Sequence, residues 1–223
     1  MISANPSDVA EHLQWPLPQP WPRHGSPLRL GVMASGAGSN FEALVVATRD
    51  GPLRAEVALL VVNNATCGAR ARAERLGIPC QCLDHRAFPT REDLDGALIQ
   101  AFQSVAVDLV VMAGWMRIVT PRLIEAFPDR LLNIHPSLLP SFRGLDAVGQ
   151  ALAAGVRLTG CTVHLVRPEV DDGPILAQAA VPVKDADDAA SLAARIHRQE
   201  HRILPLAVAL AAQRLEDLDR VQG

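Results

Sequence analysis

The stretch LRLGVMASGAGSNFEALVVATRD, residues 28–50, decides the fold of this chain. It opens with an apolar run of strand length, which ends at the segment SGAGSN, residues 35–40. A helical pattern follows and stops near Gly51 and Pro52. A strand that runs through a glycine loop into a helix is the opening of a β-α-β unit. The sequence therefore predicts an α/β domain that begins at Leu28.

The same alternation continues to about residue 143. Further apolar strands are expected at 55–64, 78–83, 107–114 and 130–136, and helices at 67–77, 90–105 and 120–127. Gly77 is an expected C-cap, Thr90 an N-cap with Asp93 three residues on, and Pro121 the first residue of its helix. Strands that alternate with helices indicate parallel pairs joined by right-handed crossovers.

The regular alternation of strands and helices ends after residue 143. A helix is expected at 144–155, followed by two strands within 160–183 that the segment PEVDDGP joins as an antiparallel pair. A long helix follows at 188–215, and Pro205 should kink or divide it. We expect a single Rossmann-like α/β domain with a mostly parallel central sheet, an antiparallel strand pair in its C-terminal half, and helices on both faces.

Residues 1–27 differ in composition from the rest. The segment WPLPQPWPRHGSP, residues 15–27, spaces its prolines so that neither a helix nor an interior strand can form. We expect a proline-rich tail at 1–27, partly docked through Trp15 and Trp21, and one domain at 28–223.

Composition excludes several classes of protein. The formal net charge is -3, so there is no basic excess of the kind that nucleic acid attracts. No apolar run is long enough for a membrane span, and no signal-peptide pattern opens the chain. The four cysteines are Cys67, Cys80, Cys82 and Cys161, whose spacing completes no zinc site. They are expected to be small buried side chains in a reducing cytoplasm, with neither a disulfide nor a metal.

Four polar clusters follow predicted parallel strands: SGAGSN at 35–40, NN at 63–64, GWMR at 114–117 and NIHP at 133–136. Ligands bind at the carboxyl ends of the strands in open parallel sheets. One such cluster is ordinary loop chemistry, but four at the same edge of a sheet predict a site.

The glycine loop suits a phosphate monoester. Its glycines allow close backbone approach, the following helix offers free N–H groups, and Ser39 and Asn40 add side-chain hydrogen bonds. It matches neither the dinucleotide-binding nor the P-loop motif. A tight turn with an N-cap explains the loop equally well.

Asn133 and His135 lie two residues apart on one strand, so both side chains point to the same face. An amide can donate to a carbonyl oxygen that gains charge, and a histidine can donate or shuttle a proton. The alternative is a buried histidine satisfied by the backbone. One of the adjacent Asp171 and Asp172 could orient the histidine, although an aspartate before glycine more often caps a loop. No nucleophile-elbow motif is present, so these groups suit direct acyl transfer between two bound substrates.

From Leu28 to about Leu210 the chain resembles the phosphoribosylglycinamide formyltransferase family. Six stretches carry the resemblance, in the family's order and spacing: SGAGSNFEAL, AGWMRIV, LLNIHPSLLPSFRG, GCTVHLV, EVDDGPILAQ and RQEHRILP. The resemblance implies an enzyme that takes 10-formyltetrahydrofolate as co-substrate and glycinamide ribonucleotide as acceptor, acting as a monomer or homodimer without nucleic acid, membrane or metal.

The resemblance also assigns roles residue by residue. It implies a catalytic trio of Asn133, His135 and Asp171, with Asp171 favoured over Asp172. Substrate-binding positions are implied at Gly38, Ser39, Asn40, His197, Arg198, Gln199 and Glu200. Folate-binding positions are implied at Arg91, Met116, Arg117, Ile118, Val119, Asn133, Arg167, Pro168, Glu169, Val170 and Asp171. Three positions depart from the family's usual residues: Arg143, Asp146 and Asp172.

Three alternatives stay open. A formyltetrahydrofolate hydrolase shares the trio but usually carries an N-terminal regulatory domain and His-His-Ser where this chain has His135-Pro136-Ser137. A methionyl-tRNA formyltransferase-like enzyme would need a basic C-terminal domain. A non-catalytic folate-binding module would not need all three trio residues.

Overall fold

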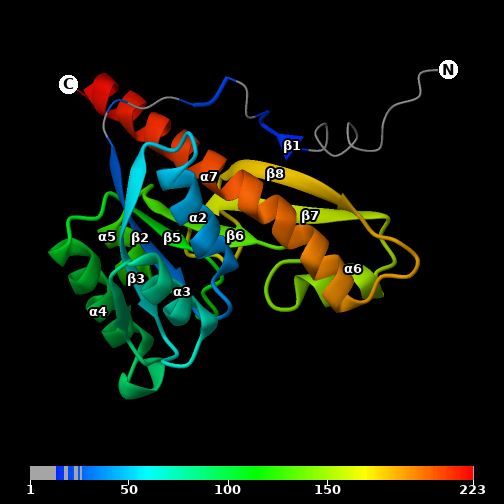
Figure 1. Cartoon of the computed structure of the whole chain (residues 1–223), viewed down its shortest axis with the longest axis horizontal. Coiled ribbons are helices and arrows are strands. Elements are labelled where there is room, and N and C mark those ends of the chain that lie inside the picture. The colour runs from blue at the N-terminus through cyan, green and yellow to red at the C-terminus, as the bar shows by residue number, and fades with distance from the viewer. Residues whose placement is uncertain (1–13, 18–19, 23–24, 26, 223) are drawn as a thin grey trace.

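The computed structural model describes residues 14–17, 20–22, 25 and 27–222 (Figure 1). Most of the expected tail, including residues 1–13, lies outside the described residues. The helices are α2 (Ser39–Arg49), α3 (Gly68–Leu76), α4 (Arg91–Ser104), α5 (Pro121–Ala126), α6 (Ala147–Ala153) and α7 (Ala189–Gln222), with the 3-10 turn η1 (His85–Ala87).

One mixed sheet forms the centre of the described chain. Its order is β1-β8-β7-β6-β5-β2-β3-β4. The strands are β1 (Gln14–Trp15), β2 (Leu28–Ala34), β3 (Ala55–Val62), β4 (Cys80–Cys82), β5 (Leu109–Met112), β6 (Leu131–His135), β7 (Leu158–Leu165) and β8 (Ile175–Pro182). Strands β4, β3, β2, β5 and β6 pair in parallel, whereas β7 pairs antiparallel with both β6 and β8. The predicted mostly parallel sheet with an antiparallel C-terminal pair is confirmed.

Two apolar cores cover the two faces of this sheet. Alternate residues of β2 enter different cores, because successive side chains of a strand point to opposite faces. Val32 packs with α2, α3 and α7, whereas Met33 packs with α4 and α5. Figure 1 shows α7 running along the sheet beside β7 and β8. Helices therefore cover both faces, as predicted.

The tail adds a strand that the sequence did not predict. Gln14 and Trp15 pair antiparallel with β8 at the edge of the sheet, where proline-rich chain is tolerated. The expected contact through the Trp15 side chain is wrong, since that residue is 74% exposed. Trp21 does pack against the apolar core. The boundary between tail and domain stays a prediction.

Pro205 does not divide the last helix. Helix α7 is assigned as one helix with Pro205 inside it. Leu204 and Leu206 on either side are fully buried. Packing of this apolar stretch offsets the loss of one backbone hydrogen bond at the proline, so the expected division of the helix is wrong, whereas the alternative, a kink at Pro205, stays a prediction.

The predicted helix ends agree with the structure. Gly77 ends α3 with a φ of 66°, and Thr90 and Asp93 form a reciprocal capping box at α4. Pro121 begins α5. Local sequence chemistry therefore fixes these boundaries.

All four cysteines are free thiols. Cys67 and Cys161 are buried as expected, but Cys80 is exposed because β4 is the far edge strand of the sheet. Among the residues that the structure describes, no three or more His, Cys, Asp or Glu side chains are grouped to hold a metal ion. No helix in that part of the chain is long and apolar enough to cross a membrane.

Candidate active site

A groove of about 660 Å³ lies where the parallel strands end. Both Asn133 and His135 line it from the end of β6, as their spacing predicted. Most of the other predicted site residues also line it: Asn40, Arg91, Met116, Arg117, Ile118, Val119, Arg167, Pro168, Glu169, Val170, Asp171, His197 and Glu200. The structure thus collects side chains from six separated segments into one cavity.

Asp171 is the centre of the polar cluster in this groove. Its Oδ1 accepts a hydrogen bond from the Asn133 amide at 3.3 Å, and its Oδ2 lies 3.3 Å from His135 Nδ1. The backbone N–H of Gly144 donates to the same Oδ2 at 2.9 Å. Asp172 points elsewhere and pairs with Arg143. Only Asp171 of the two therefore joins Asn133 and His135.

The charge state of Asp171 follows from these contacts. Burial alone would raise the pKa of its carboxyl. Contacts with His164, the Gly144 N–H and His135 outweigh burial and leave the pKa below its usual value. Asp171 is therefore an ionised acceptor at neutral pH.

Both ring nitrogens of His135 face acceptors. Nδ1 faces the Asp171 carboxylate, and Nε2 lies 2.8 Å from the backbone carbonyl of Phe142. The ring is 5% exposed, so these contacts fix its orientation. A ring that carries a proton on each nitrogen satisfies both acceptors.

Sequence reasoning missed His164. This buried residue on β7 lies with Nε2 3.2 Å from Asn133 Nδ2 and 3.6 Å from Asp171 Oδ1. The strand register pairs Asn133 directly with His164. That pairing across β6 and β7 is the signal that could have found it, but register cannot be read from either strand alone.

The glycine loop forms an open helix N-terminus. Gly38 has a φ of 79° and precedes α2, whose end has no side-chain cap. The Arg72 guanidinium donates to the Ala37 carbonyl at 2.8 Å and holds the loop against α3. Free N–H groups at such an end attract anions.

Asn40 links this loop to α7. Its Nδ2 donates to Glu200 Oε2 at 2.8 Å, and the Glu200 residue is only 3% exposed. Burial raises the pKa of the Glu200 carboxyl. The Asn40 carbonyl oxygen has no protein hydrogen-bond partner in the described part of the chain. A buried carboxylate and an unsatisfied amide oxygen are suited to a polar ligand.

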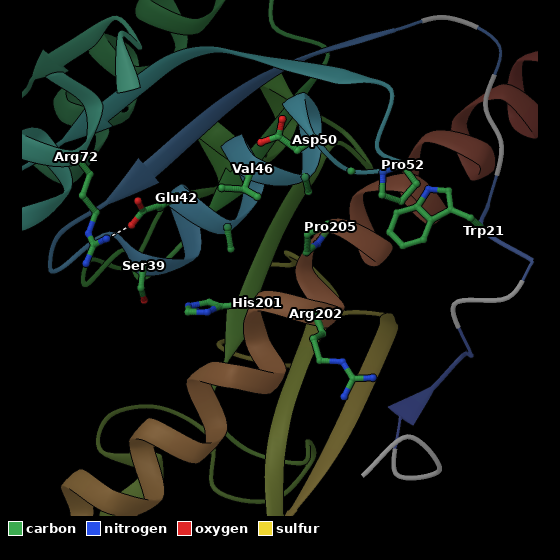
Figure 2. Close-up of a pocket in the computed structure, with 13 residues that line it drawn as sticks. Trp21, Ser39, Glu42, Val46, Asp50, Pro52, Arg72, His201, Arg202 and Pro205 are labelled. Atoms are coloured by element: carbon green, nitrogen blue, oxygen red, sulfur yellow. Dashed lines mark hydrogen bonds and ion pairs between the residues drawn. The ribbon is translucent and has the colours of Figure 1, made fainter. Parts of the chain in front are cut away.

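Four predicted substrate-binding residues do not line the groove. Ser39 instead lines a neighbouring groove of about 640 Å³ between α2 and α7. Figure 2 shows Ser39 and Arg72 at one end of it and Trp21 beside Pro52 at the other. Gly38, Arg198 and Gln199 line neither groove. Ser39 and Asn40, adjacent at the start of α2, therefore line different grooves.

Part of the groove that holds Asn133, His135 and Asp171 is lined by exposed apolar side chains, with arginines nearby. Met116, Ile118 and Val170 are 68%, 56% and 47% exposed. The Arg167 guanidinium is held by Asp129 at 2.5 Å. Apolar side chains at the mouth of a cavity, with cations at its rim, suit an aromatic ligand that carries anionic groups.

An α/β domain with an amide, an imidazole and a carboxylate converging at the strand ends defines a group-transfer enzyme that acts on a carbonyl. The chain belongs to the formyl transferase family, whose model matches residues 28–208. The phosphoribosylglycinamide formyltransferase of Bacillus subtilis is 38% identical over 180 residues, covering 81% of this chain and 92% of that protein.

Other relatives agree in fold and family. The crystal structure of glycinamide ribonucleotide transformylase 1 from Symbiobacterium toebii superposes with a TM-score of 0.83 at 46% identity, covering 85% of this chain and 89% of that chain. The human trifunctional purine biosynthetic protein adenosine-3 is 42% identical over 184 residues. That match covers 82% of this chain but only 18% of the human protein, so the chain spans under a fifth of this relative's length.

Proposed function

We propose that the protein transfers the formyl group of 10-formyltetrahydrofolate to the amine of glycinamide ribonucleotide, giving formylglycinamide ribonucleotide and tetrahydrofolate in purine synthesis. The observation that carries this proposal is the convergence of Asn133, His135 and Asp171 on one groove. The names of relatives that are about 40% identical support the choice of substrates.

In the proposed reaction the substrate amine attacks the formyl carbon. A new C–N bond forms, negative charge develops on the formyl oxygen, and the bond from that carbon to the folate nitrogen then breaks. The attacking amine loses one proton, directly or through water, and the departing folate nitrogen gains one. Atoms and charge therefore balance without a metal or a covalent enzyme intermediate.

Three side chains lower the barrier to this reaction. Asn133 donates its amide hydrogen to the formyl oxygen, and the same oxygen replaces the Phe142 carbonyl as the acceptor of His135 Nε2–H. Ionised Asp171 holds Nδ1 of the ring and stabilises its positive charge. Donors directed at a developing oxyanion are worth about 100- to 1,000-fold in turnover each.

The glycine loop is the proposed phosphate site of the ribonucleotide. Gly38, Ser39 and Asn40 present the start of α2, while His197 and Glu200 form the proposed opposite wall on α7. Arg198 and Gln199 lie between them in the sequence and are proposed to contact the ribonucleotide only on the strength of the family resemblance. We expect Ser39→Ala to weaken ribonucleotide binding and to leave folate binding unchanged. Equal losses for the two substrates would contradict the assignment.

The folate is proposed to lie against the exposed apolar wall. Its ring system would contact the segment from Met116 to Val119 and the loop from Arg167 to Asp171. Arg91 and Arg117 at the rim would face its anionic groups. All of these residues line the groove.

One assay separates this proposal from its alternatives. The disappearance of 10-formyltetrahydrofolate is followed with and without glycinamide ribonucleotide. Consumption that requires the ribonucleotide supports the transferase, equal consumption without it indicates a hydrolase, and no consumption indicates a folate-binding module. Transfer to charged initiator tRNA would indicate a methionyl-tRNA formyltransferase.

The proposed setting is the cytoplasm, where the four free thiols would stay reduced. All three trio residues come from one chain, so a monomer or a homodimer could carry out the reaction.

A further inference from the structure

An ion pair beside the trio has no role in the chemistry above. It joins Arg143 to Asp172 across two loops. Arg143 lies between Phe142, whose carbonyl meets His135, and Gly144, whose N–H meets Asp171. Asp172 directly follows Asp171. The pair therefore connects the two segments whose relative position sets the trio.

The backbone of these segments needs such support. Phe142, Asp146 and Asp171 have φ values of 57°, 54° and 53°. A left-handed conformation costs a residue with a Cβ roughly 1–2 kcal/mol, so it persists only where neighbouring groups hold it. Because three strained positions lie in or beside the trio, the placement of the trio side chains is sensitive to every contact between the two loops.

Ties on two sides hold the segment at 142–146. From α6, Gln150 Nε2 donates to the carbonyls of Arg143 at 3.1 Å and Leu145 at 2.8 Å. Toward the Asp171 loop, the Arg143 side chain reaches Asp172 while Gly144 N–H reaches the catalytic carboxylate. The two contacts toward that loop come from adjacent residues and end on adjacent residues.

We propose that the Arg143–Asp172 ion pair is a strap that positions the Gly144 N–H on Asp171 and thereby orients the carboxylate toward His135 during formyl transfer. This inference rests on the proposed function. Both members are positioning residues, because they act through Asp171. Their side chains are 43% and 45% exposed, so their effect on global stability is small.

The test is a double-mutant cycle. Arg143→Met and Asp172→Asn each remove one charge, and Arg143→Lys keeps it. We expect each neutral variant to lower kcat roughly three- to tenfold while KM for both substrates changes less than twofold. The double variant should lose no more than either single one, and Arg143→Lys should recover most of the loss. Arg157→Met is the matched control, since Arg157 forms an exposed ion pair with Asp185 between the ends of β7 and β8.

A pH profile distinguishes positioning from general destabilisation. The Gly144 N–H bond helps to lower the pKa of Asp171, which also faces His135 from β6 and His164 from β7. Loosening that bond raises the pKa, so the acid limb of the kcat profile should move to higher pH in Arg143→Met. The control variant should keep the wild-type limb.

Hydrogen exchange tests the strap without any assay of activity. Amide exchange in residues 142–146 should be faster in Arg143→Met and Asp172→Asn than in the wild type, and unchanged in Arg157→Met. Unchanged exchange, additive kcat losses, or a raised KM with kcat intact would each overturn the proposal. A wild-type protein without ribonucleotide-dependent turnover would refute the proposed function, and the exchange measurement would still decide the strap.

Discussion

Asp171 Oδ2 lies 3.3 Å from His135 Nδ1, although the two residues come from a loop and a strand separated by antiparallel strand β7. The Gly144 N–H and the Asn133 amide contact the same carboxylate. One buried anion therefore sets the orientation of both the imidazole and the amide.

Asp171→Asn tests that relationship. The amide keeps the size of the side chain but removes the charge that stabilises a protonated His135. We expect kcat to fall about 100- to 1,000-fold, the usual loss when an oxyanion-stabilising group fails. Steady-state kinetics measure the loss, and equilibrium binding of each substrate should change little. Asp185→Asn, a change in an exposed carboxylate that does not line the groove, is the control.

Glu200→Gln tests the buried carboxylate of the proposed ribonucleotide site. Because burial raises the folded pKa of Glu200, the native state keeps a proton that the unfolded chain has released. Wild-type stability therefore falls as pH rises above the ordinary glutamate pKa of 4.5 toward the higher folded pKa. We expect the variant to gain unfolding free energy relative to the wild type over that range.

Thermal unfolding at a series of pH values measures this gain. The exposed Glu125→Gln on α5 serves as the control and should show none. A Glu200→Gln variant that loses stability relative to the wild type as pH rises would contradict this prediction. It would show that the surroundings of Glu200 stabilise the ionised carboxylate.

Gly38→Ala tests the glycine loop. A Cβ at Gly38 would lie 2.6 Å from the Ala69 Cα, and the φ of 79° is left-handed. We expect a loss of about 2–4 kcal/mol in unfolding free energy, from backbone strain and from overpacking. Gly77→Ala is the matched control, because its φ of 66° is also left-handed but nothing lies within 4 Å. Denaturant unfolding should show a clearly smaller loss there.

Trp21→Ala tests whether the tail is docked. Trp21 packs partly buried against the core, whereas Trp15 is 74% exposed. We expect Trp21→Ala to cost about 1–2 kcal/mol of unfolding free energy, and Trp15→Ala to cost almost nothing. Equal effects of the two substitutions in a denaturant titration would contradict docking through Trp21.

Local patterns predicted much of the fold because the information lay within single elements. Strand β5 is a continuous apolar run and β2 is apolar except at Arg29. Thr90, Gly77 and Pro121 mark helix ends through their own backbone chemistry. The placement of Asn133 and His135 on one face followed from strand alternation alone.

Other features depend on contacts between distant segments and could not be predicted from local sequence patterns. His164 enters the cluster only through the register of β7 against β6. Residue chemistry alone left Asp171 and Asp172 open, and only the family resemblance favoured Asp171, because the direction of each side chain depends on the loop conformation. The ion pair between Arg143 and Asp172 depends on the conformation of both loops. The edge strand at Gln14 forms because β8 offers a free edge.

The most direct test of the central claim follows an isotope-labelled formyl group from 10-formyltetrahydrofolate in a single turnover with glycinamide ribonucleotide, for the wild type and for His135→Ala. The trio predicts that the wild type moves the label onto the ribonucleotide amine, and that His135→Ala binds both substrates but transfers it at least about 100-fold more slowly. Wild-type transfer by His135→Ala, or label released as formate whether or not the ribonucleotide is present, would contradict the account.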